Sequence, residues 1–161
     1  MQRFCRIIWP TSVQRRASLF REKTRSYDRH AFGECFSPSS KYAALVDPAI
    51  ADYRRVNRSQ WKLARLFPVS KPYELAPETD FAGMWVKPFS PLGERIRHYP
   101  ELPGVVEFSA VGFNRDKTIA VVYMAYTRTP LSSGWDMEIL RKQRGEWRQI
   151  VARGLVCIAR S

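Results

Sequence analysis

Apolar and polar positions alternate like those of β-strands in the C-terminal half of the chain. Residues 105–114 and 135–142 alternate between apolar and polar side chains, and residues 119–126 are apolar throughout. Alternation with a period of two indicates a half-buried strand, whereas a run rich in β-branched and aromatic residues indicates a strand buried on both faces. Residues 146–159, which include the apolar run 155–159, close the chain. Because only short connections join these runs, we predict an antiparallel meander of about four strands over residues 105–160.

The N-terminal half carries helix signals. Asp47 followed by Pro48 indicates a helix start, because Asp accepts hydrogen bonds from first-turn N–H groups and proline fits the first helical position. We therefore predict a helix over residues 48–57 whose apolar side covers one face of the central strand, and we expect the proline-rich segment to cover the other face. Residues 59–67 favour a second short helix, although their spacing also fits a strand.

Composition predicts one folded domain preceded by an arm. Residues 1–36 hold eight Lys and Arg against three acidic residues, and we expect a flexible basic arm there. Residues 37–161 are expected to form a single α+β domain. Within it, residues 68–104 contain seven prolines, which predicts an ordered connector with only short strands or turns. The expected fold class is α+β, with an antiparallel meander packed against one or two short N-terminal helices.

Charge and cysteine content indicate the kind of partner and compartment. The 27 Lys and Arg against 15 Asp and Glu give a net charge of +12, which favours an anionic partner, either nucleic acid or an acidic protein. No apolar run approaches the roughly 20 residues that span a bilayer. The apolar stretch 7–9 is too short for a secretory signal. Cys5, Cys35 and Cys157 are odd in number and widely spaced, which argues against disulfides and favours a cytoplasmic location.

The stretch GFNRDKT, Gly112–Thr118, comes within one glycine of a phosphate-binding loop. Asp116 stands where the second glycine is required and would repel phosphate, and a strand follows in place of the required helix. Asn114 and Asp116 suit a turn, because their side chains bond nearby backbone N–H groups. A calcium loop is excluded, since its glycine and its distal glutamate are missing. We therefore predict the turn of a β-hairpin.

Residues 99–150 resemble an uncharacterised family of small bacterial proteins. The resemblance rests on the tract YPELPGVVEFSAVGFNRDKTIAVVYMAY, on the small-residue turn PLSSG and on WDMEILRKQRGEW. The family implies no activity, and a Cys pair common in its turn is replaced here by Thr129–Ser133. The tract Arg141–Trp147 is more loosely similar to the end of NTF2-like domains, which implies a conical α+β fold with a pocket.

Catalytic chemistry has few candidate residues. The only histidines are His30 and His98, and no His, Cys or carboxylate cluster has metal-ligand spacing, so we expect no catalytic residues, no metal and no cofactor. Nucleophile motifs are missing as well. If the fold encloses a pocket, the residues expected to line it are Asp52, Glu74, Tyr123 and Asp136.

Two basic clusters are the candidates for anion or nucleic-acid contact. They are Arg54, Arg55, Arg58 and Lys62, which Arg65 extends, and Arg141, Lys142, Arg144 and Arg148. Cations release counterions from nucleic acid and exposed aromatic rings stack on bases, so a binder needs both clusters on one face with Trp135 or Trp147 exposed. The sequence favours a non-catalytic structural or protein-interaction module. The alternatives are a basic nucleic-acid-binding protein and a pocket-bearing NTF2-like ligand binder or enzyme.

Overall fold

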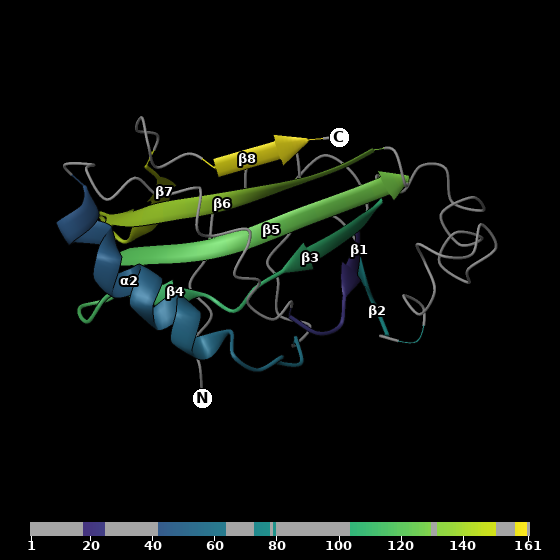
Figure 1. The fold of residues 1–161 in the computed structure, drawn as a ribbon, viewed down its shortest axis with the longest axis horizontal. Helices are drawn as coiled ribbons and strands as arrows, with labels where there is room; N and C mark the ends of the chain where they lie inside the picture. Colours follow the sequence, from purple (N-terminus) through teal and green to yellow (C-terminus); the bar gives the residue numbers. More distant parts are fainter. Residues whose placement is uncertain are drawn as a thin grey trace.

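The structure, a computed structural model, describes residues 18–24, 42–63, 73–77, 79, 104–129, 132–150 and 157–160. Within these ranges, one helix packs against a sheet of eight strands (Figure 1). The elements are β1 (Ser18–Arg21), α2 (Ala43–Val56), β2 (Tyr73–Ala76), β3 (Val105–Phe108), β4 (Gly112–Phe113), β5 (Ile119–Thr129), β6 (Ser132–Gln143), β7 (Glu146–Gln149) and β8 (Cys157–Arg160).

The sheet is mixed. Its strand order is β2-β1-β3-β5-β6-β7, with β4 also pairing with β5, and β8 with β6. From β3 onward every pairing is antiparallel, as the alternation of the C-terminal half predicted. The prediction of a simple antiparallel meander was nevertheless wrong for the whole sheet, because β1 lies parallel to both β2 and β3. These three strands are joined by long connections, which permit parallel pairing.

β1 comes from the segment expected to be a flexible arm over residues 1–36. Phe20 is only 1% exposed, and its ring lies 5.3 Å from that of Phe108. Backbone pairing places Phe20 between Leu75 of β2 and Val106 of β3. Burial of one large aromatic side chain offsets part of the entropy lost in ordering a short strand. Residues 18–24 therefore belong to the folded domain.

α2 starts earlier than its sequence signals predicted and ends where they predicted. It begins at Ala43, so Pro48 lies inside the helix and does not open it. Leu45 and Val46 pack in the core before Pro48, and this burial extends the helix toward its N-terminus. Asn57 is the C-cap, which confirms the predicted end.

Residues 59–63 form no helix, so the preference for a second helix over residues 59–67 was wrong in this part. Lys62 instead pairs with Lys23 in an isolated antiparallel bridge. Main-chain bonds flank the bridge, from the N–H of Leu63 to the carbonyl of Glu22 and from the N–H of Thr24 to the carbonyl of Trp61. Residues 64–67 lie outside the described ranges.

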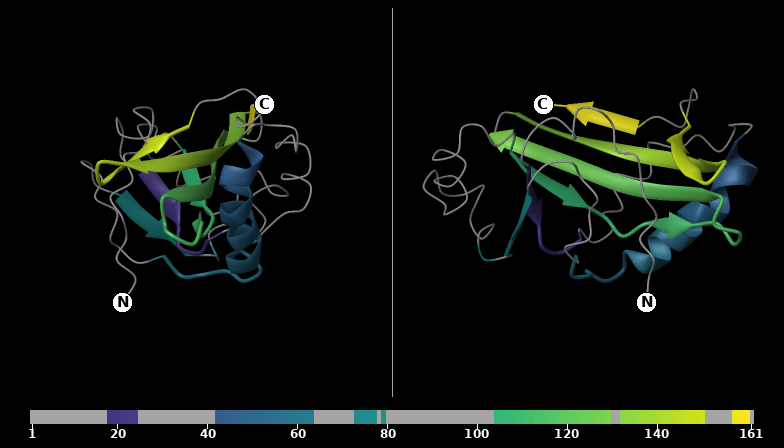
Figure 2. Two further views of the ribbon diagram at one scale, coloured as in Figure 1. Left: turned by 90° about the vertical axis from the view of Figure 1, so that its left-hand side faces the viewer. Right: turned by 180° about the vertical axis from the view of Figure 1, so that it is seen from behind.

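β5 is the central strand of the sheet and is buried on both faces, as its continuous apolar run predicted. α2 covers one face (Figures 1 and 2). This core consists of Val46, Ala49, Ile50, Tyr53, Ile119, Val121, Tyr123, Ala125, Met137 and Ile139. The opposite face carries Phe20, Leu63, Val106, Phe108, Ala120, Val122, Met124, Leu140 and Trp147. Most of the proline-rich segment 68–104, the expected cover for that face, lies outside the described residues.

The strand predicted over residues 105–114 is broken into β3 and β4. At the break, the Ser109 hydroxyl accepts the N–H of Tyr123 at 2.9 Å. The N–H and carbonyl of Ala110 turn away from β5 and bond to Asn57 of the helix end. The strand is therefore broken because the N–H of Tyr123 in β5 bonds to a side chain, and because the main chain of Ala110 bonds to the helix end in place of β5.

Gly112 lies where α2 crosses β4 and gives the first testable prediction. A Cβ atom at this position would overlap the backbone nitrogen and Cα of Tyr53, so Gly112→Ala forces the helix off the sheet. We expect a loss of about 3 kcal/mol of unfolding free energy, as overpacking against backbone gives. Urea denaturation measures it.

Gly145→Asn serves as the control for this substitution. Gly145 has a φ of +88° and open space around it, and asparagine tolerates left-handed dihedrals. The control should lose less than about 1 kcal/mol. Equal losses for the two variants would contradict close packing of α2 on β4.

Candidate functional site

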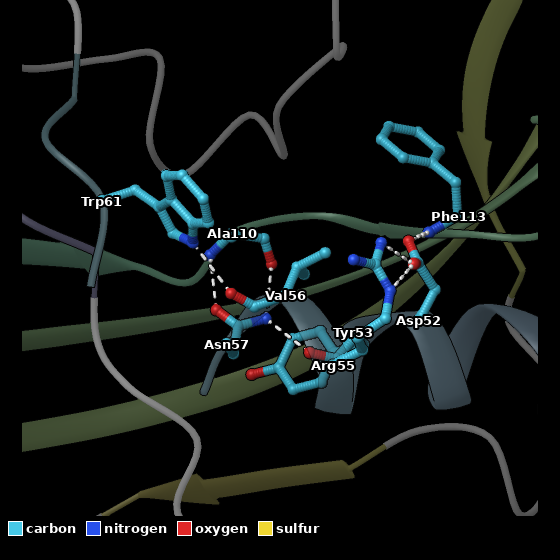
Figure 3. Close-up of polar contacts among 8 residues, drawn as sticks. All are labelled: Asp52, Tyr53, Arg55, Val56, Asn57, Trp61, Ala110 and Phe113. Carbon is cyan, nitrogen blue, oxygen red and sulfur yellow. Dashed lines mark hydrogen bonds and ion pairs between the residues drawn. The ribbon is translucent and has the colours of Figure 1, made fainter. Parts of the chain in front are cut away.

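Trp61 is a large hydrophobic residue that is exposed, with 52% of its surface accessible. Its ring is nevertheless held in place. The indole Nε1–H donates to the Val56 carbonyl at the end of α2 at 2.8 Å (Figure 3), and the main-chain N–H donates to Oγ1 of Thr24 at 2.8 Å. Trp61 is thus an aromatic surface fixed in one orientation before any partner arrives.

Asn57 fixes the end of α2 against the sheet. Its side chain is fully buried, and its Nδ2 donates to the carbonyls of Tyr53 at 2.9 Å and Ala110 at 3.0 Å. Its Oδ1 accepts the N–H of Ala110 at 2.8 Å (Figure 3). The amide joins the last helical turn to the break between β3 and β4, so the position of Trp61 is set by the sheet.

Asp52 makes a second tie between α2 and the sheet. One carboxylate oxygen accepts the N–H of Phe113 at 2.9 Å, and the other accepts the guanidinium of Arg55 (Figure 3). Asp52, one of the residues expected to line a pocket, thus holds β4 against the helix and neutralises part of the charge of Arg55.

The first basic cluster lies on both sides of Trp61 along the chain. Arg54, Arg55, Arg58 and Lys62 are all exposed, and residues 53–63 contain no carboxylate. Arg55 pairs with Asp52, and Lys62 pairs with Glu22 at 2.7 Å. We call the following exposed residues the Trp61 surface: Lys23, Arg54, Arg55, Arg58, Trp61 and Lys62.

Lys23 and Lys62 make this surface electrostatically unusual. They are directly opposite each other in the antiparallel bridge, and the two main-chain bonds that flank it define a non-hydrogen-bonded pair. Side chains approach more closely in such pairs than in hydrogen-bonded ones, and like charges directly opposite are unfavourable. Glu22 compensates one of the two ammonium groups. An anion between the lysines would relieve the remaining repulsion.

The second basic cluster occupies the β6–β7 hairpin. Arg141, Lys142, Arg144 and Arg148 are exposed there. The hairpin lies near the N-terminal end of α2, whereas the Trp61 surface follows the C-terminal end (Figures 1 and 2). The two clusters therefore do not gather around one aromatic ring.

The tryptophans expected near the hairpin cluster are packed in the fold. Trp147 is 2% exposed and lies beneath Lys142, whose Nζ is 5.9 Å from the ring centroid. Trp135 is half-buried and stacks on Tyr123 with centroids 5.9 Å apart. Sequence reasoning missed the exposure of Trp61, which lay within the short helix or strand expected over residues 59–67. The available signal was its place between Gln60 and Lys62, directly after a helix end.

The remaining pocket candidates point in different directions. Tyr123 packs in the core beneath α2, whereas Asp136 pairs with Met124 on the opposite face of the sheet. Glu74 is exposed on β2. His30 and His98 lie outside the described residues, as does Arg65.

The part of the chain that the structure describes has neither a cluster of metal ligands nor a membrane-spanning helix. No three His, Cys, Asp or Glu side chains gather there as a metal site would require. None of its helices has the length and apolar character to cross a membrane.

The Gly112–Thr118 stretch is the turn of a hairpin, as predicted, because β4 pairs antiparallel with β5. Asn114 Oδ1 accepts the N–H groups of Thr118 at 2.9 Å and Ile119 at 2.8 Å. The Thr118 hydroxyl donates to Asp116 at 2.9 Å. The amides that a phosphate loop would offer to a ligand are therefore bound to the turn's own side chain.

Glu138 is a buried carboxyl group on the face opposite α2. It is 7% exposed and stands across from Val122 of β5. Burial, and to a smaller degree the carboxylate of Asp136 on the same face, raise the pKa of Glu138 to about 7. The group is therefore partly protonated at neutral pH.

Comparisons of the chain with protein-family models, with curated proteins and with solved structures find no match. The resemblances to the bacterial family and to NTF2-like domains therefore stay predictions of the sequence. The case for a function rests on the geometry of the described residues.

Glu138 gives a prediction about pH. Its pKa in the folded chain lies above the ordinary value of 4.5, so the folded state binds more protons than the unfolded state between about pH 4 and 7. Stability is consequently lost as the pH rises through this window. Glu138→Gln removes the cost of ionising a buried carboxyl group. The unfolding free energy of the variant should therefore rise relative to that of the parent chain as the pH rises, by at most about 3 kcal/mol at pH 8.

Urea unfolding of both chains at pH 5 and pH 8 measures this difference. Glu146→Gln is the matched control, because Glu146 is exposed and paired only with Arg148 on β7. It should change stability by less than about 0.5 kcal/mol at either pH. A difference between Glu138→Gln and the parent that does not change with pH would contradict the raised pKa.

Proposed function

We propose that the protein is a non-catalytic binding module that docks an anionic macromolecule on the Trp61 surface. The observation that carries this proposal is the orientation of Trp61, which is exposed yet held by hydrogen bonds through its indole and its main chain. Ordering a side chain at an interface costs about 0.5–1.5 kcal/mol. An aromatic ring that is already ordered avoids most of that cost.

Charge supports an anionic partner. Four cationic side chains and no carboxylate lie within residues 53–63, and Lys23 adds a fifth cation across the bridge from Lys62. The repulsion between the two lysines weakens when an anion binds, so binding gains energy that the free surface does not have. The net charge of +12 also raises the rate of encounter with a polyanion at low salt.

Two of the pocket candidates, Asp52 and Tyr123, are better explained as structural groups. Asp52 holds Phe113 and Arg55, and Tyr123 packs beneath α2 against Trp135. Each has a partner that accounts for its place in the fold, and this favours binding over catalysis. The sequence-based preference for an interaction module is retained in the proposal.

A pair of charge reversals tests where the polyanion binds. Arg58→Glu on the Trp61 surface and Arg144→Glu in the β6–β7 turn both change the net charge from +12 to +10, and both residues are exposed. With heparin as the polyanion at about 50 mM salt, Arg58→Glu should weaken affinity at least about fivefold, and Arg144→Glu less than about twofold.

Affinity chromatography on immobilised heparin, followed by titration calorimetry, measures both variants against the parent chain. The affinity of the parent should also fall steeply between about 50 and 200 mM salt. Equal losses for the two reversals would mean that net charge alone controls binding, and the proposed site would be wrong.

A further inference from the structure

We infer that the anionic partner is a single-stranded nucleic acid, one base of which stacks on the ring of Trp61. This inference rests on the proposed function and names the partner class. It follows from the neighbours of the ring, from the way the ring is held, and from the paired lysines beside it.

The neighbours of Trp61 distinguish a base from a protein. A protein-binding hot spot is normally surrounded by further apolar contacts that exclude water. Trp61 has Arg58, Ser59, Gln60 and Lys62 around it along the chain, all exposed. Among the residues whose side chains the structure describes, no other large hydrophobic side chain is exposed. An exposed aromatic ring with cations before and after it along the chain suits base stacking, because each base offers one flat face and needs no apolar rim.

The way the ring is held leaves it available for stacking. Its only polar atom, Nε1, is committed to the Val56 carbonyl (Figure 3). The indole therefore has no free donor with which to read base edges. Recognition would depend on stacking and charge, which tolerate any base sequence. A duplex keeps its base faces stacked on one another, so the surface favours single strands.

The lysine pair supplies cations for the sugar-phosphate backbone. Lys62 directly follows Trp61, and Lys23 is held opposite it by the bridge. Arg58 precedes the ring and is exposed. Cations thus come before and after the stacking residue along the chain. Glu22, which now pairs with Lys62 at 2.7 Å, would be displaced by a phosphate. Such a phosphate would interact with the ammonium groups of both Lys23 and Lys62, whereas Glu22 in the free protein pairs with Lys62.

Fluorescence anisotropy with the full chain tests the inference. The probes are a labelled ten-residue oligothymidylate, an abasic strand of the same length and charge, a duplex, and a polyglutamate peptide, each at about 50 mM salt. Trp61→Ala should weaken oligothymidylate binding at least about fivefold, as loss of one stacked base does. Trp61→Phe keeps a stacking ring and should stay within about threefold of the parent.

The abasic strand separates stacking from charge. It should bind more weakly than oligothymidylate to the parent chain, and Trp61→Ala should leave its affinity unchanged. If Trp61→Ala has no effect on oligothymidylate while Arg58→Glu still weakens it, base stacking is wrong and the polyanion site stands. Tighter binding of polyglutamate than of oligothymidylate overturns the nucleic acid in favour of an acidic protein. If none of these probes nor heparin binds, the proposed function itself fails.

Discussion

The side-chain amide of Asn57 is the contact on which the rest of the arrangement depends. It joins the last turn of α2 to the main chain of Ala110, and it does so without contact with solvent. Leaving one buried polar group without its partner costs about 1–3 kcal/mol, and this side chain satisfies three groups at once. It therefore explains the break between β3 and β4, the crossing of α2 over β5, and the fixed position of Trp61 beyond the helix end.

Packing around β5 makes this contact possible. Alternate residues of the strand enter two different cores, so α2 can lie across one face while Phe20 and Phe108 occupy the other. Because Gly112 has no side chain, the backbone of α2 at Tyr53 packs directly against β4. Asp52 holds the two elements together by accepting a hydrogen bond from the N–H of Phe113. The helix is thus held at two points, and its C-terminal end becomes a rigid support for exposed side chains.

The elements that were predicted from sequence are those with a local pattern. The strand β5 follows from its continuous run of apolar residues, and the turn at Asn114 and the helix end at Asn57 follow from the chemistry of their side chains. β1 was missed because four residues in a basic segment carry no period, and its partners lie more than fifty residues away. The hydrogen bonds between Asn57 and Ala110 join residues 53 apart in sequence. The exposure of Trp61 depends on these long-range contacts. Tyr123 and Asp136 lie on opposite faces of the sheet because of the register between β5 and β6. That register cannot be predicted from a local sequence pattern.

The account thus places the binding surface beyond the end of α2, where a fixed indole is followed along the chain by one of the paired lysines. The most direct test is an amide and indole NMR titration of the ¹⁵N-labelled chain with unlabelled oligothymidylate. The account predicts that the indole signal of Trp61 and the amides of Lys23, Arg58 and Lys62 shift together and saturate. Shifts confined to the β6–β7 hairpin, with the Trp61 indole unchanged, would contradict it.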